Sequence, residues 1–281
     1  MKTIYLDCSM GAAGDMLMAA LYELLPEKEA FLEKMNALGL PGITLSAEPS
    51  VKCGITGTHM RVLVHGEEEG AAHAHTHGHS HDNEHAHTHA GLHEIEHRIS
   101  HLALSETVRE NVLAVYRSIA DAESRVHGVP VDEIHFHEVG SLDALADVTG
   151  VCLLFEMLAP EQVLCSPVHV GSGQVRCAHG ILPVPAPATA RLLEGIPVYG
   201  GSIRGELCTP TGAALLRRFV TRFGAMPPMC MEKCGYGMGT KDFEAANCVR
   251  AIWGQTLASG GQITELACNL DDMTPEDVGF A

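Results

Sequence analysis

The sequence predicts an α/β fold in which strands and helices alternate around a mixed sheet, and an α+β fold is the alternative. Near the N-terminus, and again around residues 134–158, a β-prone run is followed by a glycine-containing turn and then by a helical pattern. The chain has 281 residues, of which 46% are hydrophobic, so it can bury a sizeable core. We expect an N-terminal α/β lobe, a flexible His-rich insertion, a main α/β domain and the start of a C-terminal region that the chain does not contain, over residues 1–66, 67–90, 91–258 and 259–281.

The N-terminal lobe begins with a β-prone run and a turn that contains two glycines. After this turn, an apolar run and then a second helical pattern, which Gly39 and Pro41 end, precede two β-prone runs. The lobe is therefore expected to contain a strand, two helices and two further strands, at residues 2–6, 16–25, 27–38, 43–47 and 60–64.

The insertion at residues 67–90 consists mainly of Glu, His, Ala, Thr and Gly, and no side chain in it is large enough to anchor a core. Neutral imidazoles bind Ni, Zn, Cu and Co, and their alternation in a flexible segment lets several pairs close around one ion. We expect a metal-binding tract, with a passive linker as the alternative. Its candidate ligands are His73, His75, His77, His79, His81, His85, His87 and His89.

The main domain is expected to continue the alternation, with a Gly- and Met-rich loop between its last helix, which ends near residue 223, and the strand at residues 249–253. The patterns predict helices at residues 92–102, 105–126, 141–158, 188–193 and 209–223, and strands at residues 134–139, 163–170, 249–253 and 262–270. In the first of these helices, His93, His97 and His101 lie opposite the apolar stripe. His93 and His97 also match the H-E-x-x-H pattern, but a catalytic zinc needs a shielded cleft, so a zinc protease is disfavoured.

Charge and hydropathy exclude several classes of protein. The net charge of −17 repels phosphate backbones and anionic lipids, so neither nucleic acid nor membrane is an expected partner. Acidic residues interrupt the longest apolar run near the start, which therefore predicts neither a signal peptide nor an anchor, and we expect a cytoplasmic protein. In a reducing compartment, the ten cysteines are expected to be free thiols or metal ligands.

A first candidate site combines a β-prone run with the helix after it. His135 and His137 share one face of the expected strand, with Glu138 next to them, and Asp143 and Asp147 share one face of the helix. These groups can converge around the turn, where they would suit a metal or a Mg-phosphate group. The alternative is that Asp143 caps the helix and the histidines lie on an exposed strand face.

A second candidate site is the first glycine turn, which Asp7 and Asp15 flank and which contains Gly11 and Gly14. Ligand sites of alternating α/β folds gather where strands end and helices begin. The two aspartates are therefore candidate catalytic groups, and the two glycines are candidates for binding a cofactor.

A third candidate site is the turn with Thr209, Thr211 and Gly212, which offers hydroxyl groups and backbone N–H groups at a helix N-terminus. Such a turn suits phosphate or carboxylate, although helix capping explains these residues equally well. A Walker sequence is absent from the chain.

Six ordered motifs point to one family. They are Asp7-Cys8-Ser9-Met10-Gly11-Ala12-Ala13-Gly14-Asp15-Met16, His135-Phe136-His137-Glu138-Val139-Gly140, Gly171-Ser172-Gly173, His179-Gly180 with residues 183–189, Thr209-Pro210-Thr211-Gly212-Ala213-Ala214, and Gly235-Tyr236-Gly237-Met238-Gly239. In this order they resemble the LarC family of nickel-insertion proteins over nearly the whole chain, and a His tract in the same place is typical of that family.

The resemblance implies a nickel chelatase, a metal-inserting lyase that places Ni(II) in pyridinium-3,5-bisthiocarboxylic acid mononucleotide and consumes CTP with a divalent cation. The product would be the nickel-pincer cofactor of enzymes such as lactate racemase. Family members continue past a segment like residues 269–276 into a C-terminal domain, where the resemblance would place CTP. Expected partners are therefore that domain or a second chain, the recipient apo-enzyme and further copies in a homo-oligomer. A non-catalytic nickel or zinc storage protein or metallochaperone is the alternative.

Overall fold

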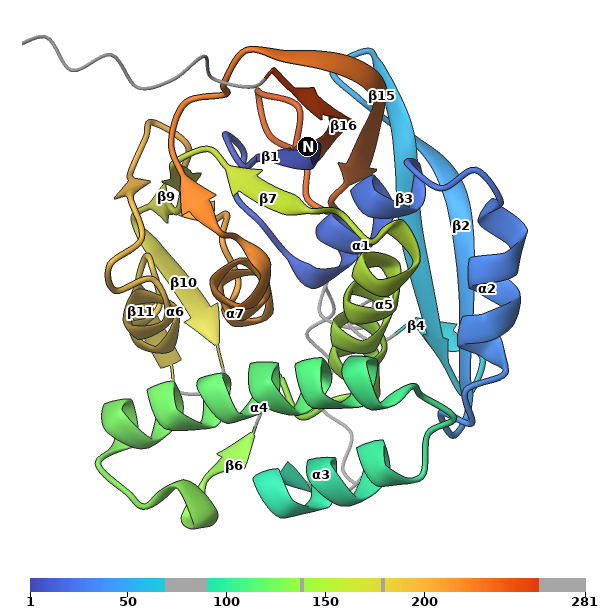
Figure 1. Cartoon of the computed structure of the whole chain (residues 1–281). Coiled ribbons are helices and arrows are strands. Elements are labelled where there is room, and N and C mark those ends of the chain that lie inside the picture. The colour runs from blue at the N-terminus through green and yellow to red at the C-terminus, as the bar shows by residue number, and fades with distance from the viewer. Residues whose placement is uncertain (69–89, 137–138, 178–179, 258–281) are drawn as a thin grey trace, which may run out of the picture.

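The computed structural model describes residues 1–68, 90–136, 139–177 and 180–257 (Figure 1). The helices in these ranges are α1 (Gly14–Tyr22), α2 (Lys28–Asn36), α3 (Leu92–Ser100), α4 (Glu106–His127), α5 (Leu142–Leu158), α6 (Pro187–Leu192) and α7 (Pro210–Phe219), with a 3-10 turn η2 (Val131–Glu133). The main sheet contains β1 (Lys2–Asp7), β2 (Ile43–Lys52), β3 (Ile55–Val64), β4 (Glu67–Glu68), β7 (Gln162–Cys165), β14 (Arg222–Phe223), β15 (Met229–Met238) and β16 (Cys248–Thr256).

This main sheet is mixed, as the sequence predicts for an α/β fold. Its strand order is β14-β7-β1-β16-β15-β3-β2, and β4 pairs with β3 at one edge. β1 is parallel to β7, and β7 is parallel to β14, whereas β1 and β15 are both antiparallel to β16. The first strand of the chain, β1, therefore lies inside the sheet between β7 and β16, two strands from the second half of the chain.

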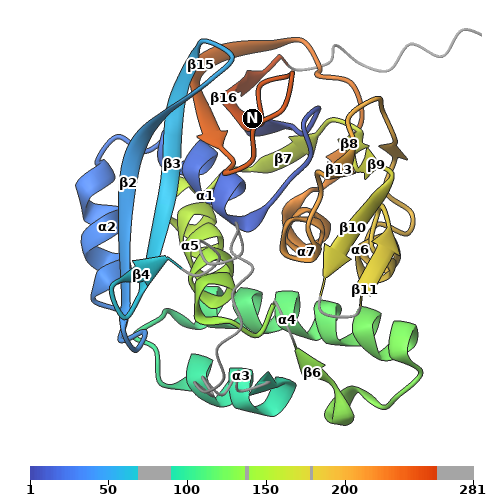
Figure 2. The same ribbon diagram turned by 180° about the vertical axis from the view of Figure 1, so that it is seen from behind.

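Smaller paired strands extend the fold beside the sheet. They are β5 (Ala90–Gly91) with β6 (His135–Phe136), β8 (Val168–His169) with β12 (Val198–Tyr199), β9 (Gly171–Ser172) with β13 (Gly205–Glu206), and β10 (Gln174–Cys177) with β11 (Gly180–Pro183). Figure 2, which views the molecule from behind, shows β9, β10, β11 and β13 gathered around α6 and α7.

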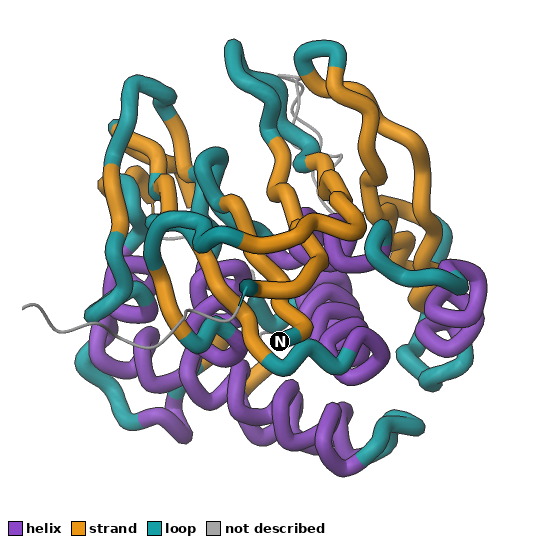
Figure 3. Tube along the Cα trace, turned by 45° about the horizontal axis from the view of Figure 1, so that its top comes forward, coloured by secondary structure: helices purple, strands orange, loops and turns teal. Residues whose placement is uncertain are grey.

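Most helices lie on one side of the main sheet, as Figure 3 shows. The apolar helix α1 packs against β15 and β3 and against α5, and the long α4 crosses α5, α6 and α7 (Figure 1). One hydrophobic core joins Leu17 and Leu21 of α1 with Tyr116 of α4 and Leu145 of α5. The expected boundaries at residues 66 and 91 stay a prediction, although this core contains side chains from both sides of them.

Helix boundaries agree with the capping residues. The Ser105 hydroxyl accepts a hydrogen bond from the Val108 N–H at 3.2 Å, and α4 ends at Gly128 with a left-handed φ of 67°. Thr209 caps α7 in the same way by accepting a hydrogen bond from the Gly212 N–H. The predicted N-terminal strand and the first two predicted helices are likewise confirmed as β1, α1 and α2.

The Gly- and Met-rich loop was a wrong prediction, because residues 229–238 form the ten-residue strand β15. Its glycines are needed for helix packing: a Cβ on Gly237 would lie 1.8 Å from the Met16 carbonyl oxygen of α1, and one on Gly235 would lie 2.3 Å from the Ala20 carbonyl oxygen. Close packing of helix on strand therefore selects glycine at positions where a loop also favours it.

Other predicted strands are shorter than expected. Within the described part of the run at 134–139, which excludes residues 137 and 138, the strand is the two-residue β6, and it pairs with β5 outside the main sheet. The run at 163–170 is divided into β7 and β8 at Ser166 and Pro167, since proline cannot donate to a strand ladder. The helix expected to reach residue 223 ends at Phe219, because residues 222–223 form β14 and pair with β7 in the main sheet. The His tract and the run at 262–270 lie outside the described residues.

Candidate functional site

A pocket of about 260 Å³, which we call the acidic pocket, lies where α1, α5 and α7 begin and where β3 passes them. It contains three carboxylates, one imidazole and three threonine side chains. Its lining residues are Ala13, Gly14, Asp15, His59, Met60, Val62, Asp143, Asp147, Thr209, Thr211 and Thr240. Six of the residues predicted as site residues therefore line one pocket: Gly14, Asp15, Asp143, Asp147, Thr209 and Thr211.

Close packing of α1 against α5 joins the first glycine turn to the aspartates of α5. Asp15 lies in the first turn of α1, and Asp143 and Asp147 lie one turn apart near the start of α5. A Cβ on Gly14 would lie 2.8 Å from both Cβ and Oδ2 of Asp147. Glycine at this position therefore lets the Asp147 carboxylate approach the start of α1.

The pocket favours the neutral form of the Asp147 carboxyl. Its Oδ1 atom is buried and has no hydrogen-bond partner. Desolvation raises the pKa of Asp147 well above its ordinary value, and the neighbouring charges of Asp15 and Asp143 raise it further. A cation between these carboxylates would remove the repulsion and supply the partner that Oδ1 lacks.

Asp15 has a related but weaker perturbation. Desolvation raises its pKa, while the Met16 N–H and the nearby His59 ring lower it, and the Asp143 charge raises it. Asp143 also stabilises the first turn of α5. Its Oδ1 accepts hydrogen bonds from the Ser141 hydroxyl and from the Ala144 N–H, the latter at 2.7 Å. The expected capping function of Asp143 and its place in the pocket are therefore both observed.

His59, on β3, was not predicted as a site residue. Its Nδ1 lies 3.0 Å from the Met238 carbonyl oxygen, which can only accept, so in the neutral ring Nδ1 carries the proton. Nε2 then keeps the lone pair that a metal ion uses. A single histidine on a strand gives no spacing signal in the sequence, which explains why it was missed.

The threonine turn at the start of α7 meets the first glycine turn. The Thr209 and Thr211 hydroxyl oxygens are 2.9 Å apart, and a Cβ on Gly212 would lie 2.1 Å from the Ala12 carbonyl oxygen. A Cβ on Gly11, whose φ is +85°, would lie 2.0 Å from the Leu207 carbonyl oxygen. Gly11 and Gly212 thus permit close backbone packing, and neither lines the acidic pocket.

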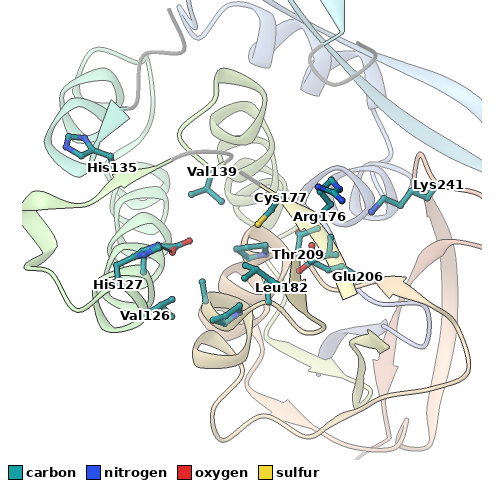
Figure 4. A pocket seen from close by; sticks show the side chains of 16 residues that line it. Val126, His127, His135, Val139, Arg176, Cys177, Leu182, Glu206, Thr209 and Lys241 are labelled. Carbon is teal, nitrogen blue, oxygen red and sulfur yellow. Dashed lines mark ion pairs between the residues drawn. The ribbon is translucent and has the colours of Figure 1, made fainter. Parts of the chain in front are cut away.

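A second, larger pocket of about 590 Å³ lies beside the acidic pocket, and Thr209 lines both (Figure 4). Figure 4 shows Arg176 and Lys241 near Thr209 and Glu206, with His127 and His135 on the other side of the opening. The other lining residues are Glu123, Val126, Val139, Val175, Cys177, Leu182, Ala186, Pro187, Ala188 and Pro210. Its lining combines apolar walls with two cationic side chains, Arg176 and Lys241, and two carboxylates, Glu123 and Glu206, so it suits an organic ligand that carries an anionic group at the cationic end.

The remaining predicted residues lie elsewhere. The convergence of His135 with Asp143 and Asp147 is not found, because His135 is exposed and lines the large pocket. Asp7 instead forms an ion pair with Arg250 at 2.6 Å on the main sheet. His137, Glu138 and the eight tract histidines lie outside the described residues. Within the part of the chain that is described, no group of three or more His, Cys, Asp or Glu is already arranged to hold a metal ion.

The fold and these pockets define an α/β protein with a carboxylate-lined pocket and an adjoining larger pocket. The family described as "Nickel insertion protein" matches residues 4–281, and the chain belongs to that family. No solved structure matches the chain. Among the described residues, no helix is both long and apolar enough to cross a membrane.

Curated relatives agree with this assignment. The chain is 39% identical to a "Putative nickel insertion protein" of Geotalea daltonii, over 100% of this chain and 68% of the relative. It is 40% identical to the "Pyridinium-3,5-bisthiocarboxylic acid mononucleotide nickel insertion protein" of Clostridium kluyveri, over 98% and 68%, and 36% identical to the protein of that name from Staphylococcus saprophyticus, over 99% and 66%. The chain therefore spans about two thirds of the length of these relatives.

Proposed function

We propose that the chain is a nickel chelatase that inserts Ni(II) into pyridinium-3,5-bisthiocarboxylic acid mononucleotide to form a nickel-pincer cofactor. Family membership and the names of the relatives support this substrate. The observation that carries the proposal is the acidic pocket, in which the Asp147 Oδ1 atom is buried without a partner beside two further carboxylates.

In this proposal Ni(II) is a substrate that the acidic pocket holds only briefly. Asp15, Asp143 and Asp147 offer oxygen ligands, and His59 offers Nε2. These donors bind a borderline dication, while the sulfur atoms of the organic substrate are softer and bind nickel more strongly. Since no three-residue site is prearranged among the described residues, the pocket would hold the ion loosely and release it to sulfur.

The large pocket would hold the organic substrate. A mononucleotide with two thiocarboxylate groups is an anion, which Arg176 and Lys241 would attract, and Arg176 can bind a phosphate through two parallel hydrogen bonds. Val139 and Leu182 would contact the ring. Its volume of about 590 Å³ is within the usual size of small-molecule sites. Thr209 is common to both pockets, so the anion and the cation would meet beside it.

Insertion also requires a proton acceptor, because a carbon–nickel bond forms where a ring carbon loses its proton. A carboxylate with a raised pKa accepts a proton more readily at neutral pH, and Asp147 has this property. We assign nickel binding to Asp15, Asp143 and Asp147, and we assign proton acceptance to Asp147 once the ion has passed to the organic substrate. Of the other proposed catalytic groups, His135 lies at the large pocket, Asp7 lies outside both pockets, and His137 and Glu138 are kept as candidates.

The proposal extends to components that the described residues do not contain. CTP with a divalent cation would drive insertion and would be bound mainly by a C-terminal domain or a second chain. The tract histidines at 73–89 would collect Ni(II) in the cytoplasm, and the loaded cofactor would pass to an apo-enzyme such as lactate racemase. Homo-oligomer formation is part of the same proposal.

The experiment mixes the protein, together with the C-terminal domain or second chain that binds CTP, with Ni(II) and the precursor, with and without CTP, and measures nickel-containing product by mass spectrometry. We expect product with the wild-type chain and a loss of at least tenfold in the Asp147→Asn variant. Asp121→Asn, which changes an exposed carboxylate on α4, is the matched control and should retain full yield. Nickel binding without any product would overturn the proposal and favour a storage protein.

A further inference from the structure

We propose that the C-terminal end of α3 carries a second binding site for a divalent transition-metal ion such as Ni(II), with His97 and His101 as its protein ligands. The site is separate from the two pockets, and it does not depend on the proposed insertion reaction. Its remaining ligands would be water molecules, so the ion would exchange readily with solvent.

The geometry of the two imidazole rings carries the inference. His97 lies in the last turn of α3 and His101 is the C-cap residue, one helical turn further along. Their Nε2 atoms are 3.3 Å apart, and their ring centroids are 4.6 Å apart. Two nitrogen ligands at about 2.0–2.1 Å from one ion are separated by roughly 3.3 Å in a tetrahedral site and by roughly 2.9 Å in the tetragonal geometry that Ni(II) favours, so one ion can bind both atoms after a shift of only a few tenths of an ångström.

The position on the helix favours a cation there. Unpaired carbonyl groups give a helix C-terminus a partial negative charge, which stabilises a bound cation. Ile95 and Ile99 are fully buried and fix the orientation of α3, so both histidines remain exposed to solvent. The Arg98 guanidinium on the same helix is neutralised by Glu94 at 2.5 Å.

The same histidine-rich helix contains an internal comparison. His93 and His97 have the spacing of the H-E-x-x-H pattern, but the close ring contact in the structure is between His97 and His101. His93 is exposed and provides a control on the same helix, and His65, exposed at the end of β3, provides a control elsewhere. A direct hydrogen bond between His97 and His101 would also give the 3.3 Å separation, and the experiment distinguishes the two.

The experiment is residue-resolved labelling of the whole chain with diethyl pyrocarbonate at pH 7.5, titrated with nickel chloride and read by peptide mass spectrometry. Residue resolution is required because the tract histidines compete for nickel. We expect labelling of His97 and His101 to fall together at least fivefold, while His93 and His65 change less than twofold.

Variants distinguish a chelate from independent binding or a hydrogen bond. His97→Ala should abolish the nickel protection of His101, and His93→Ala should leave it unchanged. Labelling of His97 and His101 that is insensitive to nickel at saturation would overturn the proposal, as would protection of His101 that survives His97→Ala. A hydrogen bond alone predicts equal labelling with and without nickel.

Discussion

Replacing Asp147 with Asn should stabilise the metal-free protein and remove most of its stabilisation by nickel. In the wild type, a buried oxygen atom without a partner lies beside two other carboxylates. A buried unsatisfied polar group costs about 1–3 kcal/mol, and more when it is charged. Asn removes the charge, and its amide can donate to Asp15 or Asp143, so we expect a gain of about 1–3 kcal/mol at pH 7 without metal. For a chain of this size, each kcal/mol raises Tm by about 2–4 °C.

Nickel should offset most or all of the stability advantage of Asp147→Asn. An ion at about 100 times its Kd stabilises a folded protein by about 2.7 kcal/mol, provided that it does not bind the unfolded chain. The tract histidines should bind nickel in the unfolded chain as well, so their net effect on Tm is small. With saturating nickel the wild type should therefore gain stability while Asp147→Asn gains little.

The pH dependence of the metal-free protein has a defined sign. A carboxyl whose folded pKa is raised favours the folded state at low pH, and this contribution is lost as the pH rises from about 4 through the raised pKa. The stability of the wild type relative to Asp147→Asn should therefore fall as the pH increases from 4 to 8.

The assay is thermal unfolding of both proteins in a chelator and in nickel chloride. Asp121→Asn is the control, because Asp121 and Arg125 form an ion pair at 3.2 Å whose side chains are 58% and 60% exposed. Such a pair contributes about 0–1 kcal/mol, so the control should change little. Lower stability of Asp147→Asn in chelator, together with an unchanged nickel shift, would refute the reasoning.

Four other expectations concern the pockets and the tract. Gly14→Ala should cost about 1–3 kcal/mol in thermal unfolding and weaken nickel binding, because its Cβ would collide with Asp147, whereas Gly91→Ala, with its nearest neighbour at 3.5 Å, should change neither. Deleting residues 71–90 should remove most weakly held nickel in calorimetric titration without changing Tm. Nickel affinity of the whole chain should fall steeply between pH 7 and pH 5, because imidazoles with a pKa near ~6.5 bind metal only when neutral. Arg176→Gln should weaken binding of the anionic precursor about tenfold, measured by calorimetry, and leave nickel binding unchanged.

The elements that the sequence predicts well are those defined by local signals. The Ser105 cap and the left-handed Gly128 bound α4 because both act within a few residues of the helix ends. β15 has no comparable local signal. Gly235 and Gly237 are required because α1, which is distant in the sequence, packs closely against the strand at these positions. A glycine required by packing and a glycine required by a turn are identical in a single sequence.

In the candidate site, too, local signals identify single residues, whereas their convergence depends on packing between distant segments. Asp15 and Asp147 each lie near a helix start, which marks them as candidates, but their convergence depends on how α1 packs against α5. His135 was grouped with Asp147 because both flank one turn, and the short β6 instead directs it to the large pocket. His59 joins the carboxylates only because β3 passes the start of α1, which no local pattern reports.

The position of nickel in the folded protein tests the central claim most directly. Crystals of the chain soaked in nickel chloride, with anomalous diffraction at the nickel edge, would locate each bound ion. We predict a nickel peak in the acidic pocket, roughly 2.0–2.2 Å from a carboxylate oxygen of Asp147 and of at least one of Asp15 and Asp143. Nickel peaks that lie only outside this pocket, with no ion bound to Asp147 at saturating nickel, would contradict the account.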